Sequence, residues 1–134
     1  MAISSRFAHT LLVVRVLAGH GRAGASSSTL AAEISTSPVV IRRLLRPLCC
    51  AGVVDRHLGR FGGYSLARAA GAITLLDIYK AMALGDSEPF LIRYRGSRIL
   101  VILDEFLRSA RGALADGLRS ITVKNLLRNR PIGA

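Results

Sequence analysis

Three arginines, Arg42, Arg43 and Arg46, have the residue type and spacing in this sequence that most clearly suit a chemical task. They follow Ser37-Pro38, a typical helix start, because a serine hydroxyl caps the first turn and proline fits its first position. On that helix the arginines and Val39 lie opposite a stripe of isoleucine and leucine. Arginine pairs bidentately with guanine, and a helix N-terminus can hold phosphate. The pattern predicts a DNA-reading helix, with a solvated basic face as the ordinary alternative.

A glycine-rich segment with one arginine follows the arginine helix. Two short extended runs, at residues 53–58 and 64–67, flank it, which predicts a β-hairpin with a glycine-rich tip. Glycine lets the backbone approach a phosphate closely, although it serves any tight hairpin equally well. The candidate DNA contacts of the hairpin are Arg56, Gly59, Arg60, Gly62 and Gly63.

Apolar periodicity and capping residues predict the elements that position these groups. A first helix is expected over residues 4–19, and the Gly/Ser-rich residues 21–28 are expected to form a loop. A short helix over residues 29–34, capped by Ser28, and the arginine helix, which ends near Gly52, then form a helix-turn-helix. A hairpin directly after this motif is a wing.

The C-terminal part of the sequence predicts a surface for self-association. After a helix capped by Thr74 and a connecting loop at residues 85–96, a long helix is expected over residues 97–118 and a short one over 123–127, capped by Thr122. The long helix carries apolar residues every three or four positions, the spacing of a helix–helix seam. The predicted homodimer interface consists of Ile99, Leu103, Phe106, Ala110 and Ala113.

The predicted fold class is mainly α with a small β-hairpin wing. Residues 1–84 form a winged helix-turn-helix domain, and residues 85–134 add the connecting loop, the dimerisation helix and the terminal helix to the same compact unit. With 134 residues and 51% hydrophobic composition, the chain can bury one core.

The charge balance favours a nucleic-acid partner. The net charge is +11, and seventeen of the nineteen basic residues are arginine. The longest apolar run near the N-terminus is interrupted by Arg15 and is too short to span a bilayer. We expect no membrane partner and a cytoplasmic, nucleoid-associated location.

The two cysteines, Cys49 and Cys50, are adjacent. Neighbouring helix positions point about 100° apart, so the pair does not suit a disulfide within one helix. They are either small packing residues or redox-active thiols, and in the second case Arg46 is expected to lower a thiol pKa.

The residues of the helix-turn-helix and hairpin resemble the Rrf-two family of bacterial winged-helix regulators, which includes IscR, NsrR and CymR. The likeness covers about the first 85 residues. Its motifs are Ser4-Ser5-Arg6-Phe7, Ser37-Pro38-Val39-Val40-Ile41-Arg42-Arg43-Leu44-Leu45, Gly52-Val53-Val54, Gly59-Arg60-Phe61-Gly62-Gly63-Tyr64-Ser65-Leu66-Ala67 and Ile73-Thr74-Leu75-Leu76-Asp77-Ile78.

The resemblance implies a dimer built on the long helix, a palindromic operator and, in most members, repression. It places residues 59–63 in the minor groove as the wing, and it places Ser37, Val39, Arg42 and Arg43 where the family reads base edges. With these residues, the candidate DNA contacts outside the hairpin are Ser5, Arg6, Ser37, Pro38, Val39, Arg42, Arg43 and Arg46.

The sequence departs from the family pattern in three places. Leu58-Gly59 stands where Arg-Gly is usual, with Arg60 as a possible replacement for the charge, and Cys49-Cys50 stands where basic residues are common. Iron–sulfur members carry three cysteines before the dimer helix, whereas residues 85–96 hold none. The resemblance is therefore to the cluster-free branch, and we expect neither a metal nor another cofactor.

No paired carboxylates, nucleophile motif or phosphate-binding loop stands out, so the sequence does not predict an enzyme. It predicts a sequence-specific DNA-binding regulator that acts as a homodimeric repressor. The alternatives are a redox-sensing regulator that uses Cys49 and Cys50, a basic RNA- or ribosome-associated protein, and an adaptor whose winged helix no longer binds DNA. The identity of a small-molecule effector does not follow from the sequence.

Overall fold

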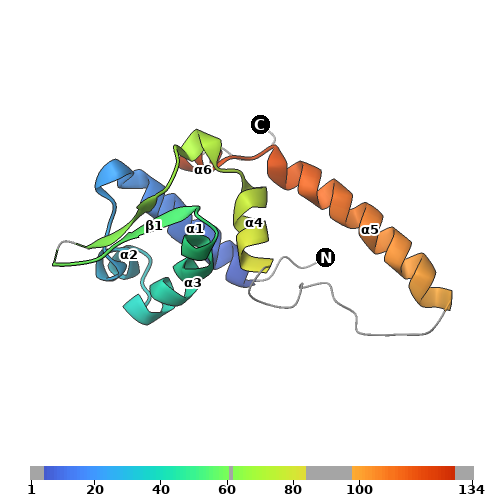
Figure 1. Ribbon diagram of the computed structural model, residues 1–134, viewed down its shortest axis with the longest axis horizontal. Coiled ribbons are helices and arrows are strands. Elements are labelled where there is room, and N and C mark those ends of the chain that lie inside the picture. The colour runs from blue at the N-terminus through green and yellow to red at the C-terminus, as the bar shows by residue number, and fades with distance from the viewer. Residues whose placement is uncertain (1–4, 61, 84–97, 129–134) are drawn as a thin grey trace.

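A computed structural model describes residues 5–60, 62–83 and 98–128 of the chain. Figure 1 shows a helical body with a two-stranded wing at one end and a long helix projecting at the other. The fold is mainly helical with a hairpin, as predicted. The helices are α1 (Ser5–Gly19), α2 (Ser27–Glu33), α3 (Pro38–Cys50), α4 (Leu75–Ala83), α5 (Arg98–Arg119) and α6 (Val123–Leu127), and the strands are β1 (Val54–His57) and β2 (Gly63–Leu66).

The core lies where α1, α3 and α4 meet. Val13 and Leu17 of α1 and Ile78 of α4 are fully buried, and the rings of Phe7 and Tyr79 make an edge-to-face contact with their centroids 5.6 Å apart. Helix α3 contributes the predicted apolar stripe of Ile41, Leu44, Leu45 and Leu48, all buried. Because this stripe faces inward, the arginine face of α3 lies on the surface.

Helix α2 begins two residues earlier than predicted, and its N-cap is Ser26 rather than Ser28. The Ser26 hydroxyl accepts a hydrogen bond from the backbone N–H of Thr29 at 3.1 Å. The shift follows from the preceding residue, because Ala25 is fixed by pairing with the wing. Residues 26–29 all carry a hydroxyl group, so the sequence alone does not show which of them caps the helix.

The segment over residues 21–28, predicted as a loop, is partly ordered by long-range pairing. Gly21–Ala23 forms a 3₁₀ turn, and Ala25 exchanges backbone hydrogen bonds with Tyr64 at 2.8 and 2.9 Å. Ala25 thus adds a third, one-residue strand to the wing. Gly24 makes the approach possible, because its φ is 67° and a Cβ there would collide with the carbonyl oxygen of Tyr64.

The wing itself is a short antiparallel hairpin. Val54 pairs with Leu66 at its base and His57 with Gly63 near its tip. A hydrogen bond of 2.8 Å between the His57 ring Nε2 and the Ser65 hydroxyl also joins the two strands. The base of the hairpin is buried in the core and its outer end is exposed.

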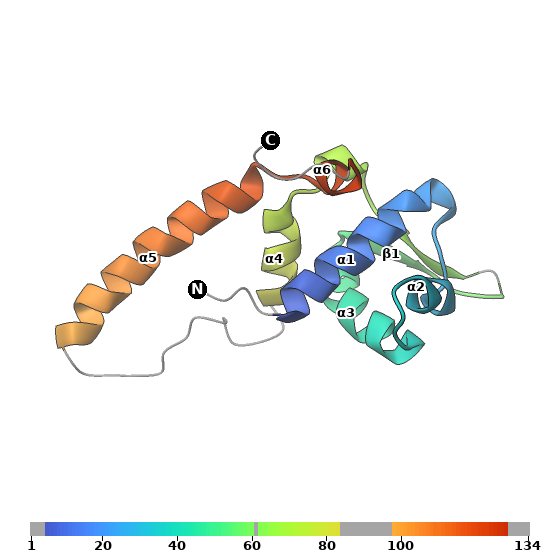
Figure 2. The same ribbon diagram turned by 180° about the vertical axis from the view of Figure 1, so that it is seen from behind.

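Helix α5 lies where the helix over residues 97–118 is predicted, and it projects away from the helical body in both Figure 1 and Figure 2. Its C-terminal end packs against the core, through Leu114, Ala115 and Leu118. Of the predicted interface residues, Ala110 is half-buried and Ala113 is exposed. The side chains of the other three, Ile99, Leu103 and Phe106, lie outside the described residues.

The chain returns from α5 to the domain through a short pairing. The backbone N–H of Leu75 donates to the Ile121 carbonyl, and that of Val123 donates to the Ile73 carbonyl, each at 2.9 Å. Thr122 caps α6 as predicted, in a reciprocal arrangement with Asn125. These bonds fix the C-terminal end of α5 beside the start of α4.

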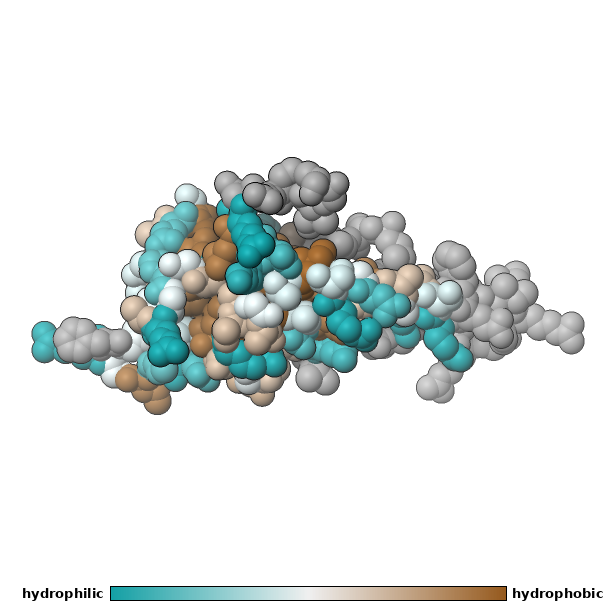
Figure 3. Space-filling view, turned by 90° about the horizontal axis from the view of Figure 1, so that it is seen from above, coloured by the Kyte–Doolittle hydropathy of each residue, from teal (hydrophilic) through white to brown (hydrophobic). Residues whose placement is uncertain are grey.

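Hydrophilic surface covers much of the wing and α5, and apolar surface shows between them over the helical body (Figure 3). Among the described residues, no helix combines the length and the apolar character that crossing a bilayer requires.

Candidate nucleic-acid interface

The start of α3 has the predicted capping geometry. The Ser37 hydroxyl accepts a hydrogen bond from the backbone N–H of Val40 at 3.4 Å, and Pro38 occupies the first turn. Ser37 is exposed, so the positive end of this helix faces solvent. Such a terminus is suited to a phosphate group.

The outward face of α3 is a stripe of four residues, Val39, Arg43, Arg46 and Cys50, which we call the α3 stripe. All four are exposed, and their spacing of four, three and four residues places them in one line along the helix. Val39 is 56% exposed although it is apolar. An exposed valine beside arginines matches what base recognition uses, since apolar side chains contact the thymine methyl group.

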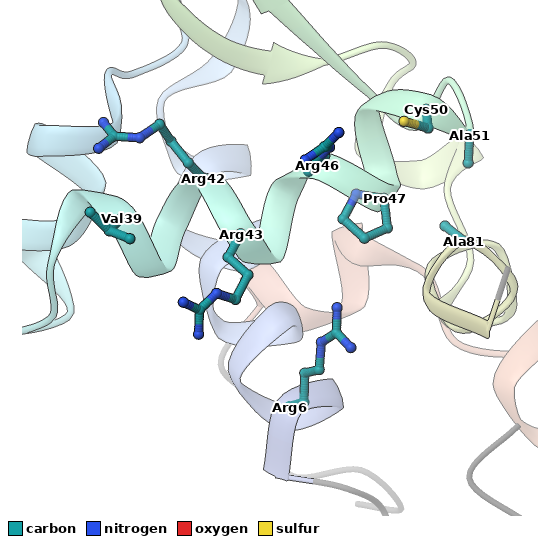
Figure 4. A pocket seen from close by; sticks show the side chains of 9 residues that line it. All are labelled: Arg6, Val39, Arg42, Arg43, Arg46, Pro47, Cys50, Ala51 and Ala81. Atoms are coloured by element: carbon teal, nitrogen blue, oxygen red, sulfur yellow. The ribbon is translucent and has the colours of Figure 1, made fainter. Parts of the chain in front are cut away.

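Arg42, which the sequence groups with Arg43, points in a different direction. Its guanidinium donates a hydrogen bond of 3.2 Å to the Ser27 hydroxyl, which ties α3 to the first turn of α2. Arg43 instead extends toward α1, and Figure 4 shows the two side chains diverging from the helix. The consecutive arginines therefore lie on opposite edges of the exposed face.

A groove of about 640 Å³ runs along α3 and is bordered by α1 and α4 (Figure 4). Arg6 points from α1 toward α3, while Arg43 points from α3 toward α1. The groove brings together five of the predicted contacts, which are Arg6, Val39, Arg42, Arg43 and Arg46. Its remaining lining residues, Pro47, Cys50, Ala51 and Ala81, were not predicted as DNA contacts.

Ala81 is the groove residue that sequence reasoning had no means of finding. It lies on α4, thirty or more residues beyond α3, and only the packing of α4 against α3 brings it here. Pro47 carries a local signal, because it sits on the exposed side of an amphipathic helix. The Ser5 side chain lies outside the described residues, although its backbone begins α1.

The groove is strongly cationic. None of its nine lining residues is acidic. Among the described residues, Arg43 and Arg46 have no carboxylate within ion-pair distance. The charges of Arg43 and Arg46 are therefore available to a partner.

The wing residues form a separate basic region. Arg56 and Arg60 are exposed, and Gly59 has a φ of 111°, in the range that favours glycine. Arg60, Gly62 and Gly63 line a shallow hollow beside the start of α2. The structure thus keeps the wing contacts apart from the groove on α3.

Leu58 is the most exposed large apolar residue of the described chain. It is 83% exposed and follows β1 directly. The family resemblance expects an arginine at this position, and exposure of this degree shows that leucine adds almost nothing to the core.

The two cysteines differ in their surroundings. Burial raises the pKa of the Cys49 thiol, Cys50 and Asp55 raise it further, and only Arg56 opposes the shift. The prediction that Arg46 lowers a thiol pKa is therefore wrong for Cys49. Cys50 is exposed on the α3 stripe.

The sequence is similar to known transcriptional regulators. Over residues 3–129 the sequence matches the Rrf2 (Rrf-two) family, described as "Iron-dependent Transcriptional regulator". It is 27% identical over 132 residues to YwnA of Bacillus subtilis (strain 168), whose name places it among HTH-type transcriptional regulators. That match covers 93% of this chain and 96% of YwnA. It is also 28% identical over 141 residues to Protein aau3 of Rhizobium meliloti (strain 1021), covering 98% of this chain and 88% of aau3.

Solved structures agree with the sequence matches. CymR (YrzC), the global cysteine regulator of B. subtilis, superposes with a TM-score of 0.73 at 26% identity, over 98% of this chain and 99% of CymR. CymR of Staphylococcus aureus gives a TM-score of 0.70 at 25% identity, over 96% of this chain and 99% of that one.

The family's description as iron-dependent can be tested against the residues present. The whole sequence has two cysteines, both on one helix, where neighbouring side chains diverge. No group of three or more His, Cys, Asp or Glu residues gathers in the part of the chain that the structure describes. These residues do not fit a cluster held by three or four cysteines. The winged helical fold and the match over residues 3–129 are nevertheless shared, and the chain belongs to the Rrf2 family of transcriptional regulators.

Proposed function

We propose that this regulator is a repressor that binds a palindromic operator as a homodimer. In each subunit α3 enters the major groove, and the wing contacts the minor groove. Repression then follows from occupancy, because a dimer bound over a promoter excludes the polymerase.

The observation that carries this proposal is the α3 stripe beside a helix start that faces solvent. An α-helix fits the major groove and reads bases mainly through residues near its N-terminus. Val39 and Arg43 lie in the first two turns of α3, and both are exposed. Arg43 has no ion-pair partner among the described residues, so it does not have to break a salt bridge in order to bind guanine.

Phosphate contacts are assigned to the groups that surround the stripe. Ser37 and the first turn of α3 suit one phosphate, and Arg6 on α1 suits another, because it points toward α3 across the groove. Arg60 at the wing suits the minor groove or its phosphates. Phosphate contacts position a protein, and base contacts specify the sequence.

The regulatory role is supported by the relatives. YwnA is named as an HTH-type regulator, and CymR is described as a global regulator. Neither relative reveals which genes this chain controls, since the operator depends on the few exposed side chains of α3.

Selection of genomic DNA tests the proposal. The purified chain is mixed with fragments of the genome that encodes it, and the retained fragments are sequenced. The strongest duplex, a scrambled duplex and an RNA of the same sequence are then titrated at several salt concentrations. We expect the operator to bind about 10³-fold or more tighter than the scrambled duplex, with affinity falling steeply as salt rises.

Footprinting on the same operator tests the symmetry. Two protected half-sites should lie about one helical turn, or roughly 34–36 Å, apart. A footprint on a single half-site would contradict the dimer model. RNA binding as tight as operator binding would instead favour the RNA-associated alternative.

A further inference from the structure

We propose that the groove between α1, α3 and α4 also binds a small organic anion with an apolar body, and that this ligand competes with DNA. The inference rests on the proposed function, because it adds regulation to the same surface. The ligand class follows from the groove's lining.

The groove combines two kinds of chemistry. Its apolar wall consists of Val39, Pro47, Ala51 and Ala81, and its cationic rim consists of Arg6, Arg42, Arg43 and Arg46. A volume of about 640 Å³ lies in the range of small-molecule sites, which are mostly apolar with a few polar groups that orient the ligand. Guanidinium groups bind carboxylate, sulfonate or phosphate groups in bidentate fashion.

The DNA proposal does not account for the whole groove. A recognition helix reads bases through its N-terminal turns, yet Pro47, Ala51 and Ala81 surround the C-terminal end of α3. The sugar–phosphate backbone is charged and needs no apolar wall. An anion whose apolar part packs against this end, with its charge beside Arg43 and Arg46, uses both kinds of lining.

Competition follows from the shared residues. Arg43 and Arg46 cannot pair with a ligand anion and with DNA at the same time, so binding of one partner excludes the other. The ligand would therefore release DNA directly, with no change of conformation required.

A fluorescent organic anion provides the test. The probe is 8-anilinonaphthalene-1-sulfonate, and its neutral counterpart N-phenyl-1-naphthylamine serves as the charge control. We expect saturable binding of the anion at one site per chain and at least about tenfold weaker binding of the neutral dye. Because the two partners exclude each other, anion at ten times its Kd should lower the apparent operator affinity about elevenfold.

A matched pair of variants localises the site. Ala51→Leu fills the apolar end of the groove at an exposed position, the C-cap of α3, whose φ of −85° and ψ of −2° are open to any residue. It should weaken anion binding about tenfold or more while operator binding in the absence of anion stays within about twofold. The control Ala32→Leu, at an exposed site on α2 that does not line the groove, should alter neither.

The outcomes separate the two proposals. Anion binding that Ala51→Leu leaves intact, or anion and operator that bind together without mutual effect, would overturn the inference. If the anion binds as expected but no duplex shows specific binding, the ligand site stands and the proposed function fails.

Discussion

At the scale of single residues, the type of a residue and the direction of its side chain contribute separately to function. Arg42 and Arg43 are neighbours of the same type, yet one is bonded to Ser27 on α2 and the other extends toward α1. Their positions differ by about 100° around the helix, which is enough to place them on opposite edges of the exposed face. The same rotation separates the half-buried Cys49 from the exposed Cys50.

Arg43→Ala should change sequence preference more than general affinity. Loss of a bidentate guanine contact costs about 1–3 kcal/mol and relaxes the preference at one base pair in each half-site. Arg60→Ala should instead weaken all duplexes alike and reduce the salt slope by roughly one unit. Titrations against the operator and its single-base variants distinguish the two effects.

Three further variants complete that experiment. Arg119→Ala removes an exposed charge at the end of α5, where the guanidinium is 2.9 Å from the Asp116 carboxylate, and should leave binding unchanged. Arg42→Ala is expected to relax base preference as well. Ser27→Ala removes only the hydrogen bond that joins Arg42 to α2, so it should leave base preference unchanged if Arg42 contacts a base directly. If neither the Arg42 nor the Arg43 variant alters base preference, α3 is not the reading helix.

Leu58→Arg should strengthen binding to DNA of any sequence. Leu58 is 83% exposed beside Arg60, so an arginine there can reach a phosphate without disturbing the core. One additional phosphate contact steepens the salt slope by about 0.9 units. Leu127→Arg adds the same charge at another exposed leucine, on α6, and should have little effect. Equal salt slopes for the wild type and Leu58→Arg would contradict this assignment.

The cysteines should react at different rates. Near neutral pH the thiol of Cys49 is protonated, because its raised pKa moves thiolate formation to higher pH. Iodoacetamide should therefore modify the exposed Cys50 first, and modification of Cys49 should accelerate only as the pH rises. Mass spectrometry of the two modified positions over time measures both rates.

An oxidant tests whether the thiols regulate DNA binding. We expect diamide to change operator affinity by less than about twofold, because burial raises the pKa of the Cys49 thiol and disfavours its reactive thiolate. A large loss that a double serine variant abolishes would instead establish a redox switch.

At the scale of elements, the wing depends on a strand that is distant in sequence. The bonds between Ala25 and Tyr64 fix the start of α2 and the base of the hairpin together. One long-range contact thus sets the position of the wing relative to the helix-turn-helix. It also explains why α2 begins at Ser27.

Gly24→Ala should destabilise the whole domain. A residue other than glycine at a φ of 67° in this extended region costs about 1–3 kcal/mol, and the added Cβ also collides with the Tyr64 carbonyl. Gly19→Ala is the matched control, because Gly19 is helical with nothing within 4 Å of an added Cβ, and should stabilise the protein by about 0.5–1 kcal/mol. Denaturant unfolding of both variants gives the comparison, and equal midpoints would contradict it.

At the scale of the whole molecule, α5 is the element that best suits contact with a second copy of the chain. Its 22 residues extend roughly 33 Å, and its C-terminal end packs on the core. A helix that projects in this way, with an apolar residue every three or four positions, is typical of an interface between two chains.

Leu103→Glu and Phe106→Glu should convert the protein to monomers or make it insoluble. The charges would lie in the predicted seam, where no partner is expected to neutralise them. Ser109→Glu, at an exposed position on the same helix, should leave the dimer intact. Sedimentation velocity at micromolar concentration measures the wild type and each variant, and a wild-type monomer under these conditions would refute the proposed interface.

The sequence alone determined the features that depend on near neighbours. Ser37-Pro38 sets the start of α3, the isoleucine and leucine stripe decides which face is buried, and Thr122 sets the start of α6. Each follows from capping or from the helical period, which act over a few residues. The glycine-rich hairpin is local as well, and together these signals were sufficient for the fold class.

Only the tertiary structure decided what depends on distant segments. Pairing of Ala25 with Tyr64 turned a predicted loop into part of the wing and chose Ser26 among four possible caps. Packing of α4 and α1 against α3 placed Ala81 and Arg6 beside the arginines and created the groove. Such contacts join residues that are tens of positions apart, and their energies come from burial and backbone pairing that no local pattern specifies.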